Sequence, residues 1–224
     1  MKPASATLDL ELQRLREHYD TLARQHGYGP EAVQMSSVES QEQRLRVLAE
    51  IVREPDASVL DFGCGTGHLC ELLRRGQGFC GRYTGYDLSG ETLALARARH
   101  PGAHFEQRDI FRDGVGGHFD YAIIGGVFNN RIADNWGFIT GALRTLFPHV
   151  RRGLAFNALS PYVDYQDPGL YHADPEAVFR FCKEELSPAV NLRHDYEVKP
   201  GVMPFEFTTQ VFRTIHAPRR KHGA

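Results

Sequence analysis

The chain has 224 residues, 42% of them hydrophobic and 24% charged, with a formal net charge of −2 at pH 7 and a pI of about 6.6. This composition is typical of a globular protein and argues against disorder or a fibrous repeat, and without a basic excess a general polyanion binder is not expected. No apolar run reaches the roughly 20 residues that span a bilayer, and the N-terminal stretch lacks the apolar core of a signal peptide, so we expect a cytoplasmic protein without membrane contact.

The N-terminal part of the chain predicts two helices. Apolar residues from Leu8 to Leu22 recur at steps of three and four, which places them on one face of a helix that ends near Gly27. A second apolar stripe runs from Val38 to Val52. We expect a single domain over 1–224, with N-terminal helices at 1–55 that cover the functional site, an α/β core at 56–215 and a basic tail at 216–224.

From Ser58 onward, strand and helix patterns alternate along the chain. Strands are predicted over 59–62, 83–87, 104–108, 119–124, 153–159, 192–198 and 205–213. Helices are predicted to begin at His68, after the capping residues Ser89 and Asp174, and near Trp136. The alternation predicts an α/β fold, a three-layer sandwich around a seven-stranded, mostly parallel sheet, and the last two strands are expected to form a hairpin that makes the last strand antiparallel.

Polar groups follow three successive predicted strands, at the edge where open α/β sheets bind ligands. The first strand runs into the loop D-F-G-C-G-T-G over 61–67, whose glycines let a ligand lie against bare backbone in front of a helix N-terminus. Asp87 and Asp109 end the next two strands, where a carboxylate can accept hydrogen bonds from a ribose diol or an adenine amino group. Each feature alone also fits an ordinary turn, but together they indicate a nucleotide-like ligand.

The cysteines predict neither a metal site nor a disulfide framework. Cys64, Cys70, Cys80 and Cys182 contain no C-x-x-C pair, and no histidine pair accompanies them at the spacing of a zinc site. We expect reduced, mostly buried thiols and no bound metal.

The glycine spacing distinguishes between nucleotide ligands. A dinucleotide fingerprint is G-x-G-x-x-G, whereas this loop reads G-x-G-x-G, with His68 where the third glycine would stand. The segment V-L-D-F-G-C-G-T-G resembles the first motif of the class I S-adenosylmethionine-dependent methyltransferases, and YTGYDLS, FEQRDIF and FDYAIIGG match the later motifs in order and spacing. The resemblance implies a Rossmann-like methyltransferase fold over about 58–213, S-adenosylmethionine as cofactor and S-adenosylhomocysteine as product.

The resemblance also implies roles for individual residues. Around the cofactor it implies Gly63 and Gly65 beneath the methionine and ribose, Asp61 at the amino group, Asp87 at the ribose, Leu88, Asp109 and Ile110 at the adenine, and Gly125 near the sulfonium. Tyr19 and Arg44 are candidates for the methionine carboxylate, although Arg44 also fits a solvated helix charge. The residues expected to face the acceptor are Phe128, Asn129, Trp136, Tyr162 and Tyr165.

No catalytic residue is identified by sequence, since methyl transfer depends chiefly on alignment of donor and acceptor. A hydroxyl acceptor would need a general base, for which His18, His172 and His194 are candidates. The expected acceptor is a small molecule methylated on oxygen or nitrogen, because GGVFNN after the fourth strand lacks the motifs of adenine, glutamine and arginine methyltransferases. An RNA or tRNA methyltransferase on the same fold, or a nucleotide-binding oxidoreductase, remains an alternative. The tail residues Arg219 to His222 could contact phosphates or simply be solvated. The acceptor's identity and the oligomeric state stay open.

Overall fold

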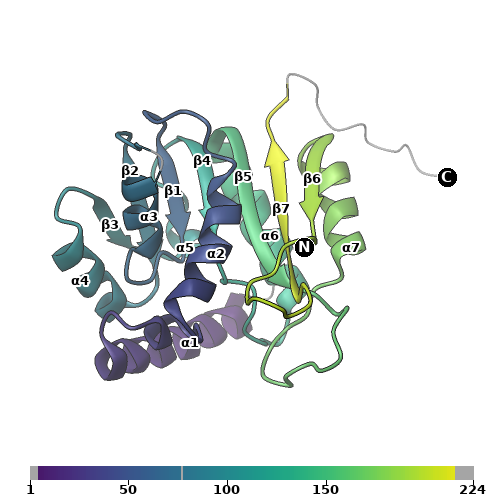
Figure 1. Ribbon diagram of the computed structural model, residues 1–224, viewed down its shortest axis with the longest axis horizontal. Coiled ribbons are helices and arrows are strands. Elements are labelled where there is room, and N and C mark those ends of the chain that lie inside the picture. The colour runs from purple at the N-terminus through teal and green to yellow at the C-terminus, as the bar shows by residue number, and fades with distance from the viewer. Residues whose placement is uncertain (1–4, 77, 215–224) are drawn as a thin grey trace.

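The computed structural model describes residues 5–76 and 78–214, and the predicted basic tail lies outside them. The described strands form one seven-stranded sheet of order β3-β2-β1-β4-β5-β7-β6 (Figure 1). The strands are β1 (Val59–Phe62), β2 (Tyr83–Asp87), β3 (His104–Gln107), β4 (Phe119–Ile124), β5 (Val150–Leu159), β6 (Ala189–Arg193) and β7 (Glu206–Phe212). β1 to β5 pair in parallel, and β7 runs antiparallel to both of its neighbours, β5 and β6. The predicted fold class is confirmed.

Helices cover both faces of this sheet. They are α1 (Ser5–His26), α2 (Val38–Ala49), α3 (His68–Gly76), α4 (Gly90–Arg99), α5 (Ile110–Asp113), α6 (Asn135–Leu146) and α7 (Pro175–Phe181), with short helical turns η1 (Pro30–Val33), η2 (Phe147–His149) and η3 (Cys182–Leu186). None of these described helices has the length and apolar character needed to cross a bilayer.

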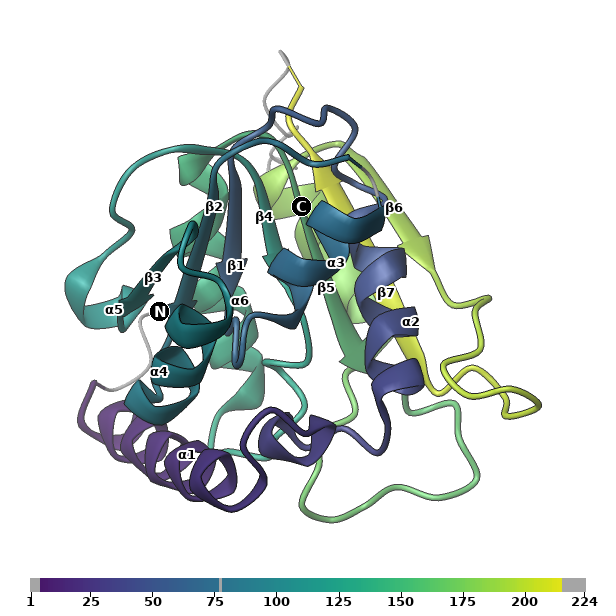
Figure 2. The ribbon, with the colours of Figure 1, turned by 60° about the vertical axis from the view of Figure 1, so that its left-hand side comes forward.

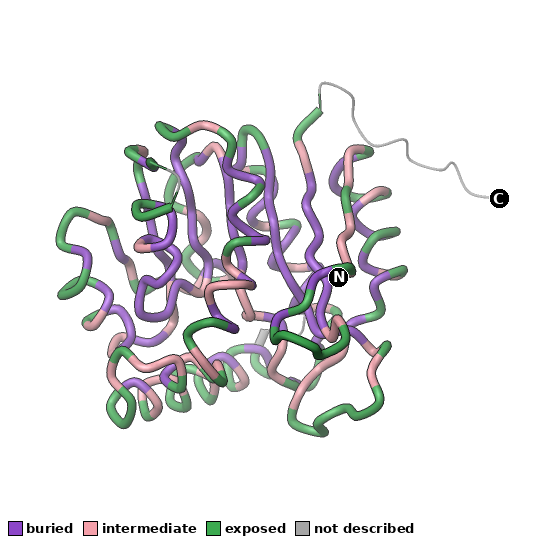
Figure 3. The backbone as a smooth tube through the Cα atoms, viewed as in Figure 1, coloured by how far each residue is buried: buried purple, intermediate pink, exposed green. Residues whose placement is uncertain are grey.

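Alternate residues of the strands pack into two separate cores, one on each side of the sheet. Leu60 and Ala122 belong to a core with α6 and α7, whereas Val59 and Tyr121 belong to a core with α2, α3 and α4. This alternation follows from the two-residue repeat of a β-strand, which sends successive side chains to opposite faces. The strands β1, β2, β4, β5 and β7 are therefore buried along most of their length, whereas the edge strands β3 and β6 are more exposed (Figure 3).

Capping side chains fix where the helices begin, and so fix the loops that precede them. Ser89 accepts a hydrogen bond from the Thr92 N–H at the start of α4, and Asp134 accepts one from Gly137 at the start of α6. Asp174 caps α7, which has Pro175 at its first position. These helix starts agree with the starts predicted from sequence to within one residue.

The end of the sheet differs from the sequence prediction. A strand was expected over 192–198, but β6 covers Ala189–Arg193. Beyond Arg193 the chain leaves the sheet, and Tyr196 and Val198 pack with Val47 of α2 in a small separate cluster. The Tyr196 hydroxyl forms hydrogen bonds there to side chains of β7. The residues of this segment therefore pack against the sheet without pairing as a strand.

Helix α1 lies across the carboxyl ends of the first strands, next to α4, in both ribbon views (Figures 1 and 2). Among the described elements, α4 and η1 are the ones that α1 contacts most extensively. α1 and η1, residues 5–33 together, are called the cover below.

Candidate functional site

A cavity lies at the carboxyl edge of β1, β2 and β4, beneath the cover. It measures about 1200 Å³ when the part open to solvent is included. All ten residues predicted to contact a cofactor line it, namely Tyr19, Arg44, Asp61, Gly63, Gly65, Asp87, Leu88, Asp109, Ile110 and Gly125. The structure thus brings together side chains that are far apart in sequence, as expected for a site at this edge of an open α/β sheet.

The glycine loop after β1 forms the floor of the cavity with its bare backbone. Gly63 and Gly65 have φ values of 78° and 51°, in the left-handed region that favours glycine. A Cβ at Gly63 would lie 2.2 Å from a methyl of Val127, and one at Gly65 would lie 2.7 Å from a methyl of Val33. Side chains at these two positions would therefore push against both the cover and the loop after β4.

Asp87 is oriented by two main-chain hydrogen bonds. Its Oδ2 accepts from the Gly65 N–H at 2.8 Å, and its Oδ1 accepts from the Ser89 N–H at 2.9 Å. Burial raises the pKa of this carboxyl, while the Ser89 and Gly65 N–H groups lower it. Each carboxylate oxygen has two lone pairs, so acceptor capacity remains for a ligand in the cavity.

Asp61, at the end of β1, is a buried acid facing the same cavity. Burial raises its pKa to about 7, opposed by a hydrogen bond from the Tyr83 hydroxyl and reinforced by the nearby charge of Asp87. A carboxylate kept from water in this way gains from a cationic ligand, because the ligand supplies the compensating charge.

The third carboxylate, Asp109, caps α5 by accepting a hydrogen bond from the Phe111 N–H at 2.9 Å. Ile110, Phe111 and Phe138 form an apolar surface beside it in the cavity. An apolar slot with one polar edge suits a flat heterocycle.

Arg44 of α2 also lines the cavity, where it is paired with a buried acid. Its Nε donates to Glu206 Oε2 at 2.6 Å, and one of its Nη atoms donates to the Ser40 hydroxyl. Glu206 is fully buried and also accepts hydrogen bonds from Asn157 and Tyr196. The guanidinium charge is therefore matched inside the wall of the cavity.

Asn157 connects this buried pair to the loop after β4. Its side-chain oxygen accepts a hydrogen bond from the Gly126 N–H at 2.8 Å, while its Nδ2 donates to Glu206. Sequence analysis missed Glu206 and Asn157, because both lie inside strands and no local pattern marks them.

A second polar cluster joins the cover to the same loop. The Tyr19 hydroxyl donates to Gln34 Oε1 at 2.8 Å and accepts from Asn130 Nδ2 at 2.8 Å. Burial raises the pKa of Tyr19 to about 12, so its hydroxyl keeps its proton near neutral pH. Gln34 has a φ of 57°, and among the described residues other than glycine it alone has a positive φ.

Two further polar side chains missed by sequence analysis line the cavity beside the glycine loop. Gln41 of α2 is buried, and His68 Nε2 at the start of α3 is buried without a hydrogen-bond partner. Burial lowers the pKa of His68, which favours the neutral imidazole. His68 stands directly after the glycine motif, which is the signal that could have identified it.

Other predicted residues lie away from the cavity that the described residues form. The residues outside its lining are Phe128, Asn129, Trp136, Tyr162, Tyr165, His18, His172 and His194. Phe128 is buried in the core against Phe138, Trp136 packs on Phe181, and Tyr162 and Tyr165 are exposed. Asn130, the neighbour of the predicted Asn129, faces the cavity instead.

The residues present fit S-adenosylmethionine, which carries positive charge at its sulfonium and ammonium groups. Three aspartates, Asp61, Asp87 and Asp109, line the cavity, and Arg44 is matched by Glu206. The apolar slot beside Asp109 and the bare glycine floor complete a cradle for an adenosyl group. The predicted contacts of each residue with the cofactor stay predictions.

Comparison with known proteins gives one family match and one extended relative. The family described as "Methyltransferase domain" matches residues 53–153. The protein "Putative methyltransferase Rv1506c" of Mycobacterium tuberculosis (strain ATCC 25618 / H37Rv) is 36% identical over 163 residues, which cover 69% of this chain and 92% of that protein.

Solved structures agree with the fold over most of the chain. A DhpI–SAM–HEP complex has a TM-score of 0.64 at 18% identity and covers 92% of this chain and 97% of the other. The plantazolicin methyltransferase BpumL, bound to a triazolic desmethylPZN analog and SAH, has a TM-score of 0.62 at 13% identity and covers 91% and 98%. At these identities the likeness concerns the fold.

Proposed function

Because this chain belongs to the class I S-adenosylmethionine-dependent methyltransferases, we propose that it methylates a small-molecule acceptor on oxygen or nitrogen. The observation that carries this proposal is the cover. Leu12, Leu15 and Val33 of the cover line the cavity together with the glycine loop. A site roofed by apolar side chains suits a ligand that is enclosed, whereas a polymer needs an open groove lined by cationic groups.

We assign the two ends of the cavity to the two reactants. The end lined by Asp61, Asp87 and Asp109 would hold the cofactor. The end lined by Asn130 and Asn157, with Arg44 and Glu206 satisfied by each other, would hold the acceptor. A wall whose charges are already matched favours an uncharged or weakly polar acceptor, because a charged one would lack an opposite charge there.

The proposed domain organisation follows this division. We propose that the chain forms one methyltransferase domain, in which the described part of 1–55 covers the site and contributes lining residues, and the described part of 56–215 supplies the rest of the cavity. The contacts of α1 with α4 and of α2 with the strands support this arrangement.

When bound, S-adenosylmethionine supplies a methyl group from its sulfonium, and the remainder of the cofactor leaves as a neutral thioether. The chain's own residues would therefore act by binding, orienting and excluding water. Asp87 would bind the ribose hydroxyls, Asp61 the ammonium group, and the apolar cover would keep water from the acceptor. Well-oriented reactants account for about 7–11 kcal/mol of a barrier.

The acceptor end also bears on whether a base is needed. The candidate bases His18, His172 and His194 do not line the cavity formed by the described residues. The side chains at the proposed acceptor end are the amides of Asn130 and Asn157 and the protonated Tyr19, which bonds Asn130. Among the proposed oxygen and nitrogen acceptors, this arrangement supports a neutral amine, which needs no strong base.

The proposal is tested with a panel of small amines, carboxylic acids and phenols. The purified protein is incubated with methyl-labelled cofactor, and transfer to each compound is measured. Label on any compound of this panel supports a small-molecule acceptor, and label on an amine in preference to a carboxylic acid supports the uncharged acceptor. Label on tRNA alone, with an affinity that falls steeply as salt rises, would replace it by the RNA methyltransferase reading.

A further inference from the structure

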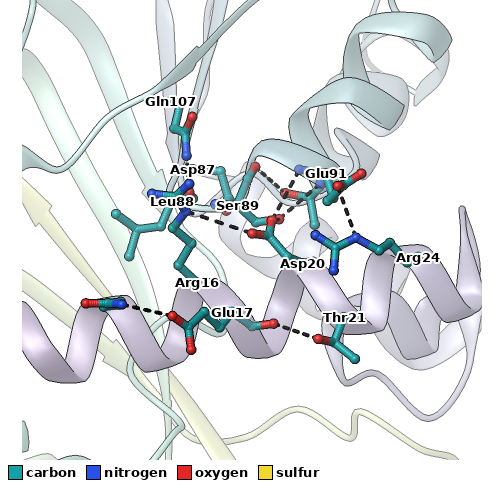
Figure 4. A network of polar contacts seen from close by, with 12 residues as sticks. Arg16, Glu17, Asp20, Thr21, Arg24, Asp87, Leu88, Ser89, Glu91 and Gln107 are labelled. Carbon is teal, nitrogen blue, oxygen red and sulfur yellow. Dashed lines mark hydrogen bonds and ion pairs between the residues drawn. The ribbon is translucent and has the colours of Figure 1, made fainter.

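Helix α1 is held on α4 by one short, partly buried contact. Asp20 Oδ1 accepts a hydrogen bond from the Ser89 hydroxyl at 2.6 Å and another from the Glu91 N–H at 3.3 Å (Figure 4). A carboxylate at the N-terminus of a helix is stabilised by the free N–H groups and the helix dipole. Asp20 therefore anchors the cover on the first turn of α4.

The same serine is hydrogen-bonded to the carboxylate proposed to bind the ribose. The Ser89 N–H donates to Asp87 Oδ1 at 2.9 Å, and the Ser89 hydroxyl oxygen accepts from the Thr92 N–H at 3.1 Å. The Ser89 hydroxyl has one proton, which it donates in the hydrogen bond to Asp20. The lone pairs of the hydroxyl oxygen remain free to accept from the N-terminus of α4. Ser89 is completely buried, which shields its side of these bonds from water.

A neighbouring ion pair adds less to this contact. Arg24 Nε lies 3.1 Å from Glu91 Oε1, but both side chains are largely exposed. Exposed ion pairs contribute little because water and salt screen them. The partly buried hydrogen bond from Ser89 to Asp20 is therefore the interaction that distinguishes a docked α1.

We propose that Asp20 is a positioning residue for cofactor binding, which couples docking of α1 over the cavity to the orientation of Asp87 through Ser89. The inference rests on the proposed role of Asp87. It implies that a bound cofactor is retained while α1 is docked, since Leu12, Leu15 and Tyr19 of α1 line the cavity above it. Release of the cofactor product then requires the contact between Asp20 and Ser89 to open.

The experiment compares Asp20→Ala, Asp20→Asn and Ser89→Ala with the wild type. Calorimetry measures the affinity for S-adenosylhomocysteine, and stopped-flow displacement measures its dissociation rate. Asp20→Ala removes the carboxylate that accepts from Ser89 and Glu91, and is expected to weaken binding about 5- to 30-fold, mainly through faster dissociation. Asp20→Asn should recover part of the loss, because its amide oxygen still accepts from Ser89.

The matched control is Glu17→Gln, on the same helix. Glu17 Oε1 contacts Gln13 of α1 rather than α4, so this variant should bind like the wild type. Because Asp20 acts chiefly through Ser89, the double variant should bind only slightly more weakly than Ser89→Ala alone, the difference being the long bond from the Glu91 N–H to Asp20. Hydrogen exchange along 5–26 in the free protein should rise in Asp20→Ala and stay unchanged in Glu17→Gln.

Several results would overturn the inference. One is an Asp20→Ala variant with the affinity and dissociation rate of the wild type. Another is a double variant whose loss of affinity equals the product of the losses in Asp20→Ala and Ser89→Ala. If Asp20→Ala unfolds, the comparison of Asp20→Asn with Glu17→Gln decides in the same way. The proposed function fails separately, when the wild type binds the product but methylates no small acceptor.

Discussion

The two ends that we assign to the cavity, one to the cofactor and one to the acceptor, are held together by different kinds of contact. At the end formed by β1 and β2, main-chain N–H groups hold Asp87, and the carboxylate keeps lone pairs toward the cavity. At the end formed by α2, β5 and β7, side chains hold each other, as Arg44 does with Glu206 and Glu206 with Asn157. The first end is built to bind charge, whereas the second presents a wall whose charges are already matched.

The largest expected effect tests whether the wall that contains Arg44 and Asn157 is held together by the buried charge pair between Arg44 and Glu206. Glu206→Ala leaves Arg44 buried without its counter-charge and removes the acceptor used by Asn157 and Tyr196. Breaking a buried pair in this way costs about 3–5 kcal/mol of unfolding free energy, measured by urea denaturation. Glu206→Gln, which keeps volume and an acceptor, should cost less. A loss below about 1 kcal/mol in Glu206→Ala would mean that the pair is effectively solvated and that the two ends do not differ as described.

The next effect tests the binding end. Asp87→Ala removes the carboxylate proposed to bind the ribose, and should weaken S-adenosylhomocysteine about 30- to 150-fold, or 2–3 kcal/mol, in calorimetric titration. Asp56→Ala changes an exposed acid of the turn before β1, at the opposite edge of the sheet, and should leave the affinity unchanged. Equal affinities in wild type and Asp87→Ala would remove Asp87 from the site.

The binding end could be predicted from sequence because its signals are local. Each carboxylate lies at or just beyond the end of a strand, and the glycine loop lies within a few residues of Asp61. The register of a parallel sheet then brings these strand ends to one edge, so order along the chain is enough to predict their meeting. The predicted cofactor residues therefore line one cavity.

The acceptor end could not be predicted because its partners are distant in sequence. Glu206 lies 162 residues from Arg44, and nothing beside either residue marks the other. Arg44 was predicted as a carboxylate ligand or a solvated charge, and the buried acid beside it was not anticipated. The aromatic residues expected to face an acceptor, such as Phe128 and Trp136, fill the core or contact α7, since hydrophobic burial competes with any role at a site.

A smaller, pH-dependent effect sharpens the description of the binding end. Burial raises the pKa of Asp61 to about 7, so the free protein keeps a proton on this group below that pH. Deprotonation favours an ammonium ligand, and affinity for S-adenosylhomocysteine should rise up to about tenfold per pH unit as the pH approaches 7, then level off.

The same raised pKa has the opposite effect on stability. Between the ordinary aspartate pKa of about 4 and pH 7, the folded state binds more protons at Asp61 than the unfolded state, so its contribution to the unfolding free energy falls as pH rises. Asp61→Asn should remove both dependences, in calorimetry and in urea denaturation between pH 5.5 and 8.5. If the variant keeps the wild-type slopes, another group causes them.

The smallest effect concerns the cover, where side chains of the cover meet the acceptor end. Tyr19→Phe removes a hydroxyl that bonds Gln34 and Asn130, which should cost about 1 kcal/mol of stability. Because burial raises the pKa of Tyr19 to about 12, the loss should be constant from pH 6 to 9. Tyr28→Phe is the control, since its hydroxyl is exposed and makes one 3.2 Å bond to Leu95. If Tyr19→Phe lowers the affinity for S-adenosylhomocysteine as much as Asp20→Ala does, the cover acts as one unit on both ends of the cavity. The contrast between the two ends would then apply to the walls of the cavity and not to the cover.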